Sequence, residues 1–227
     1  MPILKNNKGK MLFFIHIPKA AGTSIKKMLL PDVQLLFDSE FKKELPCPPQ
    51  HFHAEVLNRL GIDELVKDSF AIVRHPVARF LSEFSYRKKV DRKFKYFNTS
   101  TFFYFIRKAY AYNPYILSNH IRPQSGFIWD QSKIFKLEEG IEAICKNYPE
   151  FFIQDGHDSI QANSSNSKKV RLDPVILHGL CQFYKHDFEL FNYNKKYEVE
   201  LVQNSRIKRF VFKCIGTLFF HLYRISN

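Results

Sequence analysis

The chain has 227 residues, a formal net charge of +13 and a hydrophobic content of 45%. This length suits one α/β domain with a substantial core and is short for two. No segment reaches the roughly 20 apolar residues that a membrane-spanning helix needs. The positive charge indicates a polyanionic partner or an anionic surface. Nucleic acid would fit the charge, but no nucleic-acid-binding motif occurs, so we expect no nucleic-acid partner.

The four cysteines are scattered along the chain without the spacing of metal ligands. They suit free thiols in a reducing compartment, although four could in principle pair. Since the sequence shows no anchor segment, we expect a cytoplasmic protein, with the inner membrane surface as the alternative location.

The first expected elements follow a basic lead, residues 1–10, and open a domain that we place at residues 11–205. Residues 12–17 are apolar and rich in β-formers, which predicts a strand buried on both faces. A helix carrying apolar residues at 25, 28 and 29 follows at helical spacing. Between them Lys19-Ala20-Ala21-Gly22 offers small residues whose N–H groups can approach an anion, and Thr23 or Ser24 can cap the helix. The segment predicts a phosphate-binding loop.

A histidine pair precedes the next short helix. His51 and His53 come before residues 54–60, which read as a helix stopped by Gly61. A position near a helix N-terminus disfavours protonation, so His53 is expected to be neutral near pH 7. A neutral imidazole is what a general base needs.

A second strand–helix unit supplies another candidate phosphate contact. Residues 69–73 predict a buried strand, and residues 76–84 predict a helix with an apolar stripe. Arg74 then lies at the carboxyl end of the strand, where open α/β sheets bind ligands, and Ser82 follows inside the helix. A guanidinium holds phosphate with two donors, and a hydroxyl takes a further oxygen.

These three segments, in this order, resemble the motifs of sulfotransferases that use 3′-phosphoadenosine 5′-phosphosulfate (PAPS). Residues 18–24 are similar to the 5′-phosphosulfate-binding loop of the carbohydrate branch that includes heparan sulfate 2-O-sulfotransferase. Arg74 and Ser82 match the family's 3′-phosphate motif. His51 and His53 match a His-x-His segment that supplies the catalytic base in that branch. The loop is not a Walker A motif, because it lacks the Gly-Lys-[Ser/Thr] ending.

The resemblance implies transfer of a sulfuryl group from PAPS to a hydroxyl of a carbohydrate or glycoconjugate, without a metal. It implies His53 as general base, His51 as a second candidate for that role, and Lys19 as the group that stabilises the leaving phosphate. The donor-binding residues that it implies are Lys19, Ala20, Ala21, Gly22, Thr23, Ser24, Arg74, Ser82, Ser165 and Lys168. For Ser165 and Lys168, a polar surface loop is an equally good interpretation.

Residues 119–124 also resemble a stretch on the acceptor side of carbohydrate sulfotransferases. The resemblance implies that His120, Arg122 or Gln124 contacts the substrate, and an anionic substrate would fit the positive charge of the chain. A polar loop held by buried side chains is the alternative. Resemblance ends near residue 193, and residues 206–227 form a basic, aromatic segment that we expect to pack on the domain or to lie at a membrane surface as a peripheral contact.

The expected fold is an α/β, P-loop-like three-layer sandwich with a mainly parallel central sheet flanked by helices. Residues 31–50 are expected to be irregular, residues 133–137 a strand, residues 138–148 a helix, and a helix begins at residue 174 and continues toward 191. Two other functions remain open from the residues: a P-loop-like kinase or nucleotide-binding enzyme, and a non-catalytic protein that binds a polyanion or glycan.

Overall fold

The computed structural model describes residues 2–38, 45–154 and 170–225. The chain forms two compact units. The first contains Met1–Arg74 and Ser118–Ser164, and the second contains His75–Leu117 and Ser165–Asn227. Each unit is described by itself below.

The first unit is built on a five-stranded sheet with the order β3-β1-β2-β4-β5. β2 is parallel to β4, and β4 is parallel to β5. β1 runs antiparallel to both of its neighbours, so the other strands share one direction. The mainly parallel sheet that the sequence predicts is therefore confirmed, and so is the mixed α/β class. The elements of this unit are β1 (Ile3–Lys5), β2 (Met11–Ile15), α1 (Gly22–Lys27), β3 (Gln34–Leu36), η1 (Pro49–His51), α2 (Ala54–Arg59), α3 (Ile62–Leu65), β4 (Ser69–Val73), η4 (Gln124–Phe127), β5 (Lys133–Lys136), η5 (Leu137–Glu139) and α6 (Glu142–Asn147).

Two strands lie where the sequence predicted none. The basic lead contributes β1, in which Ile3 and Leu4 are buried and pair with β2. A turn joins the two strands, and Gly9 in this turn adopts a φ of +78° that glycine tolerates. β3 lies within the segment expected to be irregular. Both strands are three residues long, so neither shows enough alternation to be recognised from the sequence.

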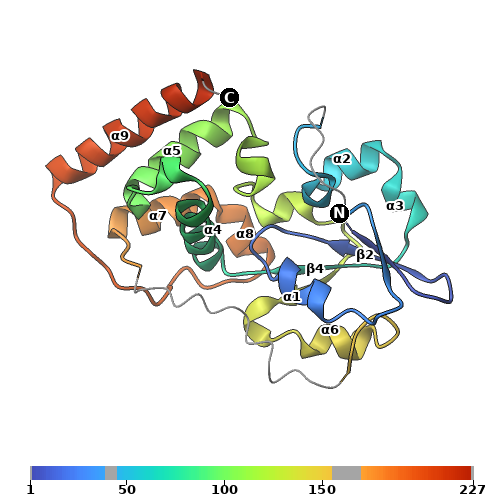
Figure 1. Ribbon diagram of the computed structural model, residues 1–227. Coiled ribbons are helices and arrows are strands. Elements are labelled where there is room, and N and C mark those ends of the chain that lie inside the picture. Colours follow the sequence, from blue (N-terminus) through green and yellow to red (C-terminus); the bar gives the residue numbers. More distant parts are fainter. Residues whose placement is uncertain (1, 39–44, 155–169, 226–227) are drawn as a thin grey trace. The chain divides into compact units, whose positions relative to one another are not determined.

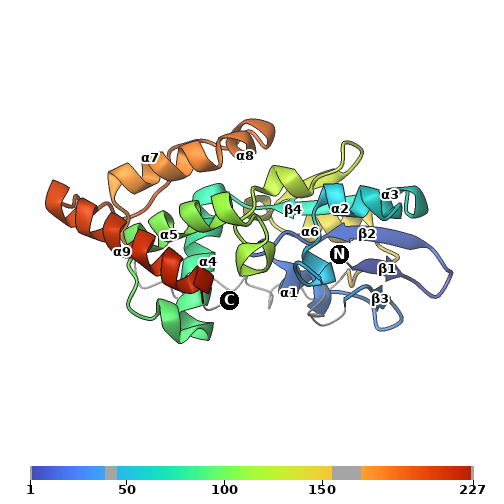
Figure 2. The same cartoon turned by 90° about the horizontal axis from the view of Figure 1, so that it is seen from above.

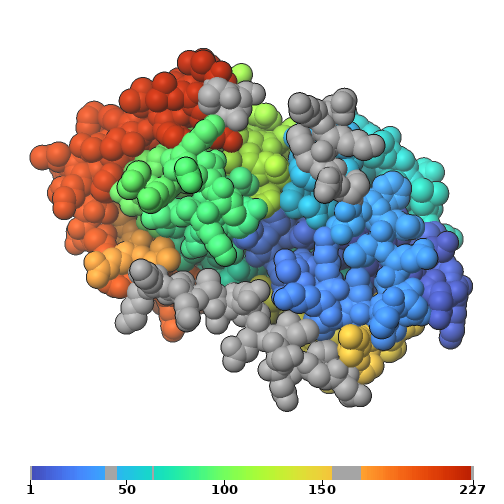
Figure 3. All heavy atoms as spheres, viewed as in Figure 1, coloured from blue at the N-terminus to red at the C-terminus, as the bar shows by residue number. Residues whose placement is uncertain are grey.

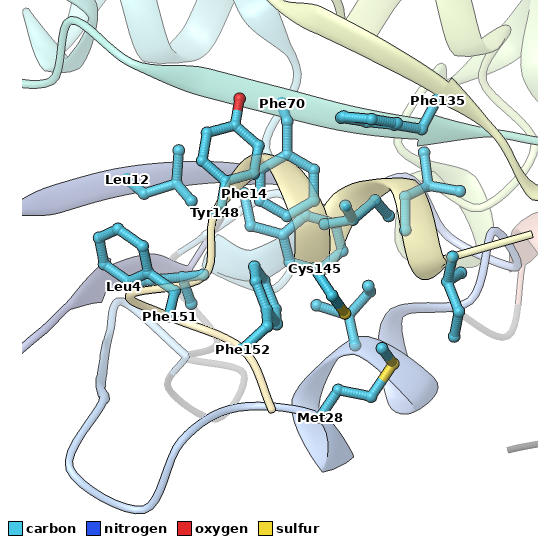
Figure 4. Close-up of a cluster of buried hydrophobic side chains, with 14 residues drawn as sticks. Leu4, Leu12, Phe14, Met28, Phe70, Phe135, Cys145, Tyr148, Phe151 and Phe152 are labelled. Atoms are coloured by element: carbon cyan, nitrogen blue, oxygen red, sulfur yellow. The ribbon is translucent and has the colours of Figure 1, made fainter. Parts of the chain in front are cut away.

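Large apolar side chains fill one face of the sheet (Figure 4). Phe14 of β2 stacks on Phe70 of β4, with ring centroids 5.0 Å apart. α1 contributes Ile25 and Met28 to this core, and α6 contributes Ile144. Figure 1 shows α1 and α6 on this face and α2 across the opposite one. The sheet is thus covered on both faces, as parallel strands with apolar residues on both sides require.

The second unit is helical. α4 starts directly after Arg74 and His75, with Pro76 in its first turn. His75 caps it, because the His75 Nδ1 atom accepts the N–H of Val77 at 3.3 Å. The elements of this unit are α4 (Pro76–Val90), η2 (Arg92–Phe94), α5 (Thr99–Tyr112), α7 (Pro174–Phe183), α8 (Lys185–Leu190) and α9 (Arg206–Ile225), and η3 (Ile116–Asn119) joins it to the first unit.

Two helices expected as continuous are divided. Gly140 has a φ of +88° and separates η5 from α6. Tyr184 ends α7, and α8 begins after it. The C-terminal segment forms α9, which packs along α5 in both views (Figures 1 and 2). Within the described residues, no helix combines the length and the apolar character needed to cross a bilayer.

Candidate active site

The loop between β2 and α1 has an unusual backbone. Lys19 and Ala21 adopt φ values of 68° and 64°, although neither is glycine. Such left-handed residues cost roughly 1–3 kcal/mol each and tend to occur at functional sites. Alternation of left- and right-handed residues turns successive N–H groups toward one point and forms an anion-binding concavity. A backbone of this kind is compatible with the phosphate-binding loop that the sequence predicts.

Two amides of this loop remain open. The N–H groups of Ser24 and Ile25 donate to the Ala21 carbonyl at 2.9 and 3.1 Å. No carbonyl among the described residues accepts from the N–H of Gly22 or Thr23. Of the two hydroxyl residues, Thr23 is exposed and Ser24 is buried. Backbone donors and the Thr23 hydroxyl are thus available to an anion.

Gly22 is required because His16 approaches it closely. A Cβ atom on Gly22 would lie 2.0 Å from the Nε2 atom of His16, a distance that carbon and nitrogen cannot adopt without bonding. His16 lies just beyond the end of β2, so the loop folds back over the end of the strand that precedes it. Any side chain at position 22 must displace this imidazole.

Arg74 is positioned by a buried amide. The Gln124 Oε1 atom accepts the Arg74 N–H at 2.9 Å, and the Gln124 Nε2 atom donates to the Arg74 carbonyl at 2.7 Å. Gln124 is fully buried. This pair of hydrogen bonds fixes the backbone at the carboxyl end of β4 as a neighbouring strand would. The Gln124 amide, assigned to the acceptor by the sequence, therefore holds a candidate donor-binding residue.

The two candidate phosphate-binding segments meet at this edge of the sheet. Arg74 Nη1 donates to the Lys19 carbonyl at 3.4 Å, across 55 positions of sequence. A guanidinium has five N–H donors, so this bond leaves others for a ligand. Both segments belong to the first unit, and both follow strands that are adjacent and parallel. The expected site at the strand ends is consistent with this arrangement.

The histidine segment lies in the same unit and is held by Asn119. Asn119 is fully buried, and its Nδ2 atom donates to the His51 carbonyl at 2.8 Å. The Asn119 Oδ1 atom accepts from Arg122 Nε at 2.7 Å. Asn119 thus links the histidine segment to the segment expected on the acceptor side. His53 caps α2 by position, as the sequence predicts, with its side chain buried.

Histidine rings form a chain across this region. The ring centroid of His51 lies 5.3 Å from that of His16 and 4.7 Å from that of His120, with edge-to-face geometry in both pairs. The Nδ1 atom of His51 is buried and makes no hydrogen bond within the described residues. Across residues 2–38, 45–154 and 170–225, no group of three or more His, Cys, Asp or Glu side chains could hold a metal ion.

The surroundings keep these histidines neutral. Burial lowers the pKa of His53 to about 4, and the Arg122 cation acts in the same direction, against the nearby Glu55. Burial also lowers the pKa of His51, and it lowers that of His16 to about 3, with Lys26 as the next cause. Neutral imidazoles at pH 7 can accept a proton, which is the state a general base requires.

The remaining predicted residues are placed as follows. Ala20 is buried and Ala21 half-buried in the loop. Ser82 lies in α4, in the second unit. Ser165 and Lys168 lie outside the described residues. The structure therefore brings together the loop and Arg74, and separately links the histidine segment to Arg122.

Sequence reasoning missed two residues of the site. His16 is the first polar residue after a buried apolar run, and this break in the pattern is a signal that could have been used. Asn119 lies in the stretch 119–124 that the sequence singles out, but nothing in that stretch indicates that Asn119 links two segments. Its φ of 67°, after positive φ values at Leu117 and Ser118, is visible only in the structure.

Comparison with known proteins identifies the family to which the chain belongs. Neither the curated proteins nor the solved structures contain a match to this chain. A family model described as Sulfotransferase family matches residues 4–194, which is most of the sequence and includes every candidate residue named above. The chain therefore belongs to the sulfotransferase family, whose members transfer sulfuryl groups.

Proposed function

We propose that the protein transfers a sulfuryl group from PAPS to a hydroxyl of a carbohydrate or glycoconjugate. The main support for the proposal is the hydrogen bond between Arg74 and the Lys19 loop, which follow two adjacent parallel strands. The resemblance of these segments to the sulfotransferase motifs implies that they bind the two anionic ends of one donor. A donor with phosphates at both ends needs two anion-binding segments close together, and these two segments meet at one edge of the sheet.

The residues present fit this donor. The loop offers the Gly22 and Thr23 amides, the Thr23 hydroxyl and the Lys19 ammonium to a 5′-phosphosulfate. Arg74 offers a guanidinium whose backbone Gln124 fixes, which suits a 3′-phosphate. We assign Ser82, Ser165 and Lys168 to the donor on the resemblance alone. PAPS supplies the sulfuryl group, and adenosine 3′,5′-bisphosphate is the product that leaves.

His53 acts as the general base in this proposal. It accepts the proton of the acceptor hydroxyl as the new O–S bond forms and the bond from sulfur to the 5′-phosphate oxygen breaks. The lowered pKa of His53, about 4, keeps the imidazole ready for that proton at pH 7. His51 is the second candidate, and its position between His16 and His120 suits a role in orienting the segment.

Lys19 balances the charge that develops on the leaving phosphate. The loop holds the Lys19 backbone in a left-handed conformation, and its ammonium acts on the 5′ side of the donor. No step requires a metal, because the cation and the amides supply the positive charge. Arg122 and His120 extend from the segment next to the histidines and are the proposed acceptor contacts. The P-loop-like three-layer sandwich is the arrangement that we propose for the domain.

The donor class is tested by calorimetric titration with adenosine 3′,5′-bisphosphate, with ATP plus Mg²⁺ as the comparison ligand. We expect micromolar binding of the bisphosphate and at least tenfold weaker binding of ATP, because only the bisphosphate matches both anion sites. A preference for ATP would favour the kinase alternative and overturn the proposal. Binding of neither ligand would favour a non-catalytic protein.

The chemical role of His53 is tested separately. His53→Ala should reduce turnover of an accepted sugar by about 10²–10⁴ while the affinity for adenosine 3′,5′-bisphosphate stays the same. His186→Ala, which removes an exposed histidine of α8, is the matched control and should keep full activity. Loss of bisphosphate binding in His53→Ala, with the fold intact by circular dichroism, would make His53 a structural residue.

A further inference from the structure

The C-terminal helix α9 has an apolar face that packs within its own unit. Phe219 lies at ring-centroid distances of 5.4, 4.7 and 5.2 Å from Phe94, Phe97 and Phe105. Gly216 allows the close approach of α9 to α5, because a Cβ atom there would lie 2.6 Å from the Thr101 carbonyl oxygen. These contacts fix which side of α9 faces inward.

A second apolar stripe follows the opposite side of the same helix. Its residues recur at intervals of three and four, which places them on one face. Each of them is exposed, with Ile207 at 76%, Leu218 at 62% and Ile225 at 79% relative accessibility. The side chains of α9, coloured red, lie at the surface in Figure 3. We call this surface the outer stripe, and its members are Ile207, Val211, Ile215, Leu218, Leu222 and Ile225.

Positive charge accompanies the outer stripe. α9 contains no Asp or Glu. Lys208 lies three positions before Val211 and thus beside the outer stripe, and the cations Arg206, Lys213 and Arg224 lie on other sides of the helix. Lys93 of η2 adds a further cation, with its Nζ atom 5.0 Å from the ring centroid of Tyr223. Arg209 is different, because it pairs with Asp173 at 3.1 Å inside the unit.

We propose that α9 docks the protein on an anionic lipid surface. The helix lies parallel to the bilayer, the outer stripe enters the boundary between headgroups and acyl chains, and the exposed cations of α9 contact anionic headgroups. α9 is not apolar enough to cross a bilayer, and its cations suit a position at the surface of one. The proposal does not depend on the sulfotransferase donor or acceptor.

Charge favours a lipid surface over a second copy of the chain. Self-association through the outer stripes would bring together two helices that carry cations and no acidic residue. Like charges placed face to face across an interface oppose association. An anionic bilayer instead offers complementary charge to the exposed cations of the helix, and the +13 charge of the whole chain adds long-range attraction.

Flotation of the full 227-residue chain with lipid vesicles tests the proposal. We expect binding to vesicles of 70% phosphatidylcholine and 30% phosphatidylglycerol and little binding to pure phosphatidylcholine. The triple variant Val211→Gln/Leu218→Gln/Leu222→Gln should weaken the partition at least about tenfold, because it removes apolar side chains from the outer stripe. The matched control is Leu60→Gln/Leu65→Gln/Val90→Gln, which changes three exposed apolar residues elsewhere and should bind as the parent does.

A charge variant tests the other half of the proposal. Lys208→Gln/Lys213→Gln should lower the partition roughly fivefold for each cation removed, since a cation near an anionic surface contributes about 1 kcal/mol. Failure of the parent to bind anionic vesicles would overturn the proposal. So would equal binding by the outer-stripe variant, or a concentration-dependent dimer in sedimentation that this variant abolishes while vesicle binding is absent.

Discussion

The ends of β2 and β4 lie side by side, yet the chain continues from them in different ways. Ile15 of β2 pairs in register with Ala71 of β4, so the segments that follow start from neighbouring points. After β2 the chain enters a tight loop with two left-handed residues and a six-residue helix. After β4 it passes Arg74 and His75 and enters a regular fifteen-residue helix.

The difference indicates different tasks for the two strand ends. The loop after β2 exposes backbone donors and a lysine, and fixed dipoles of this kind act best on charge that develops during a reaction. The segment after β4 offers one guanidinium held by a buried amide, which suits a phosphate whose charge does not change. We therefore expect changes at the first end to affect turnover and changes at the second end to affect donor binding.

Of the changes at the two strand ends, Lys19→Ala should give the largest effect. Turnover should fall by about 10²–10³, the scale for loss of one group that stabilises a developing charge. The dissociation constant of adenosine 3′,5′-bisphosphate should change much less. Single-turnover kinetics with saturating PAPS, together with calorimetry, would measure both quantities.

The matched control for Lys19 is Lys27→Ala, which removes an exposed lysine from the other end of α1. It should retain the parent's turnover. If Lys19→Ala weakens bisphosphate binding as strongly as it lowers turnover, the two strand ends do not divide the work as proposed.

Arg74→Ala should reverse this pattern. Loss of charge-assisted hydrogen bonds to a phosphate should weaken bisphosphate binding by about 10–10². Turnover at saturating donor should remain within about tenfold of the parent. Calorimetry provides the binding constant, and Arg59→Ala, which removes an arginine that is 77% exposed, provides the control. An unchanged dissociation constant would remove Arg74 from the donor site.

Gln124→Ala tests whether the buried amide matters for that site. The variant leaves the Arg74 N–H and carbonyl without their side-chain partner, so the backbone there should become less well fixed. We expect the KM for the donor to rise about tenfold, which corresponds to a loss of about 1.4 kcal/mol of binding free energy. Gln131→Ala changes an exposed glutamine and should leave KM unaltered. A pure loss of thermal stability with normal KM would give Gln124 a structural role only.

The strands that carry the site were predictable because they are strongly apolar. Residues 69–73 are all buried, and their composition alone indicates a strand inside a parallel sheet. β1 and β3 were not predictable, because each is stabilised as a strand by pairing with a neighbour rather than by its own sequence pattern. The break between α7 and α8 at Tyr184 was also invisible, since apolar residues continue at helical spacing on both sides.

For the site, the sequence predicted residue types and order but not the contacts between segments. The Lys19 loop and Arg74 could be named from their motifs, and their meeting depends on β2 and β4 being neighbours. The buried links could not be predicted. Gln124 binds Arg74 across 50 positions and Asn119 binds His51 across 68, and no local pattern carries such long-range pairs.

The smallest predicted effect concerns the histidine segment, which neither strand end contains. Because burial and then Arg122 hold the pKa of His53 at about 4, kcat should be independent of this group between pH 5.5 and 7.5. Arg122→Gln removes a cation that disfavours the imidazolium, so the pKa of His53 should rise while burial still keeps it below its ordinary value. The acidic decline of kcat should then begin at a higher pH than in the parent.

Arg122→Lys separates charge from shape in this prediction. The lysine keeps the cation near His53 and loses the planar donors that reach Asn119. A pH profile like the parent's in Arg122→Lys and a shifted one in Arg122→Gln would assign the effect to charge. The opposing carboxylate of Glu55 and the nearby Arg59 remain in both variants, so they cannot account for a difference. Identical profiles in all three proteins would show that a group other than His53 limits turnover at low pH, and the assignment of the general base would then fail.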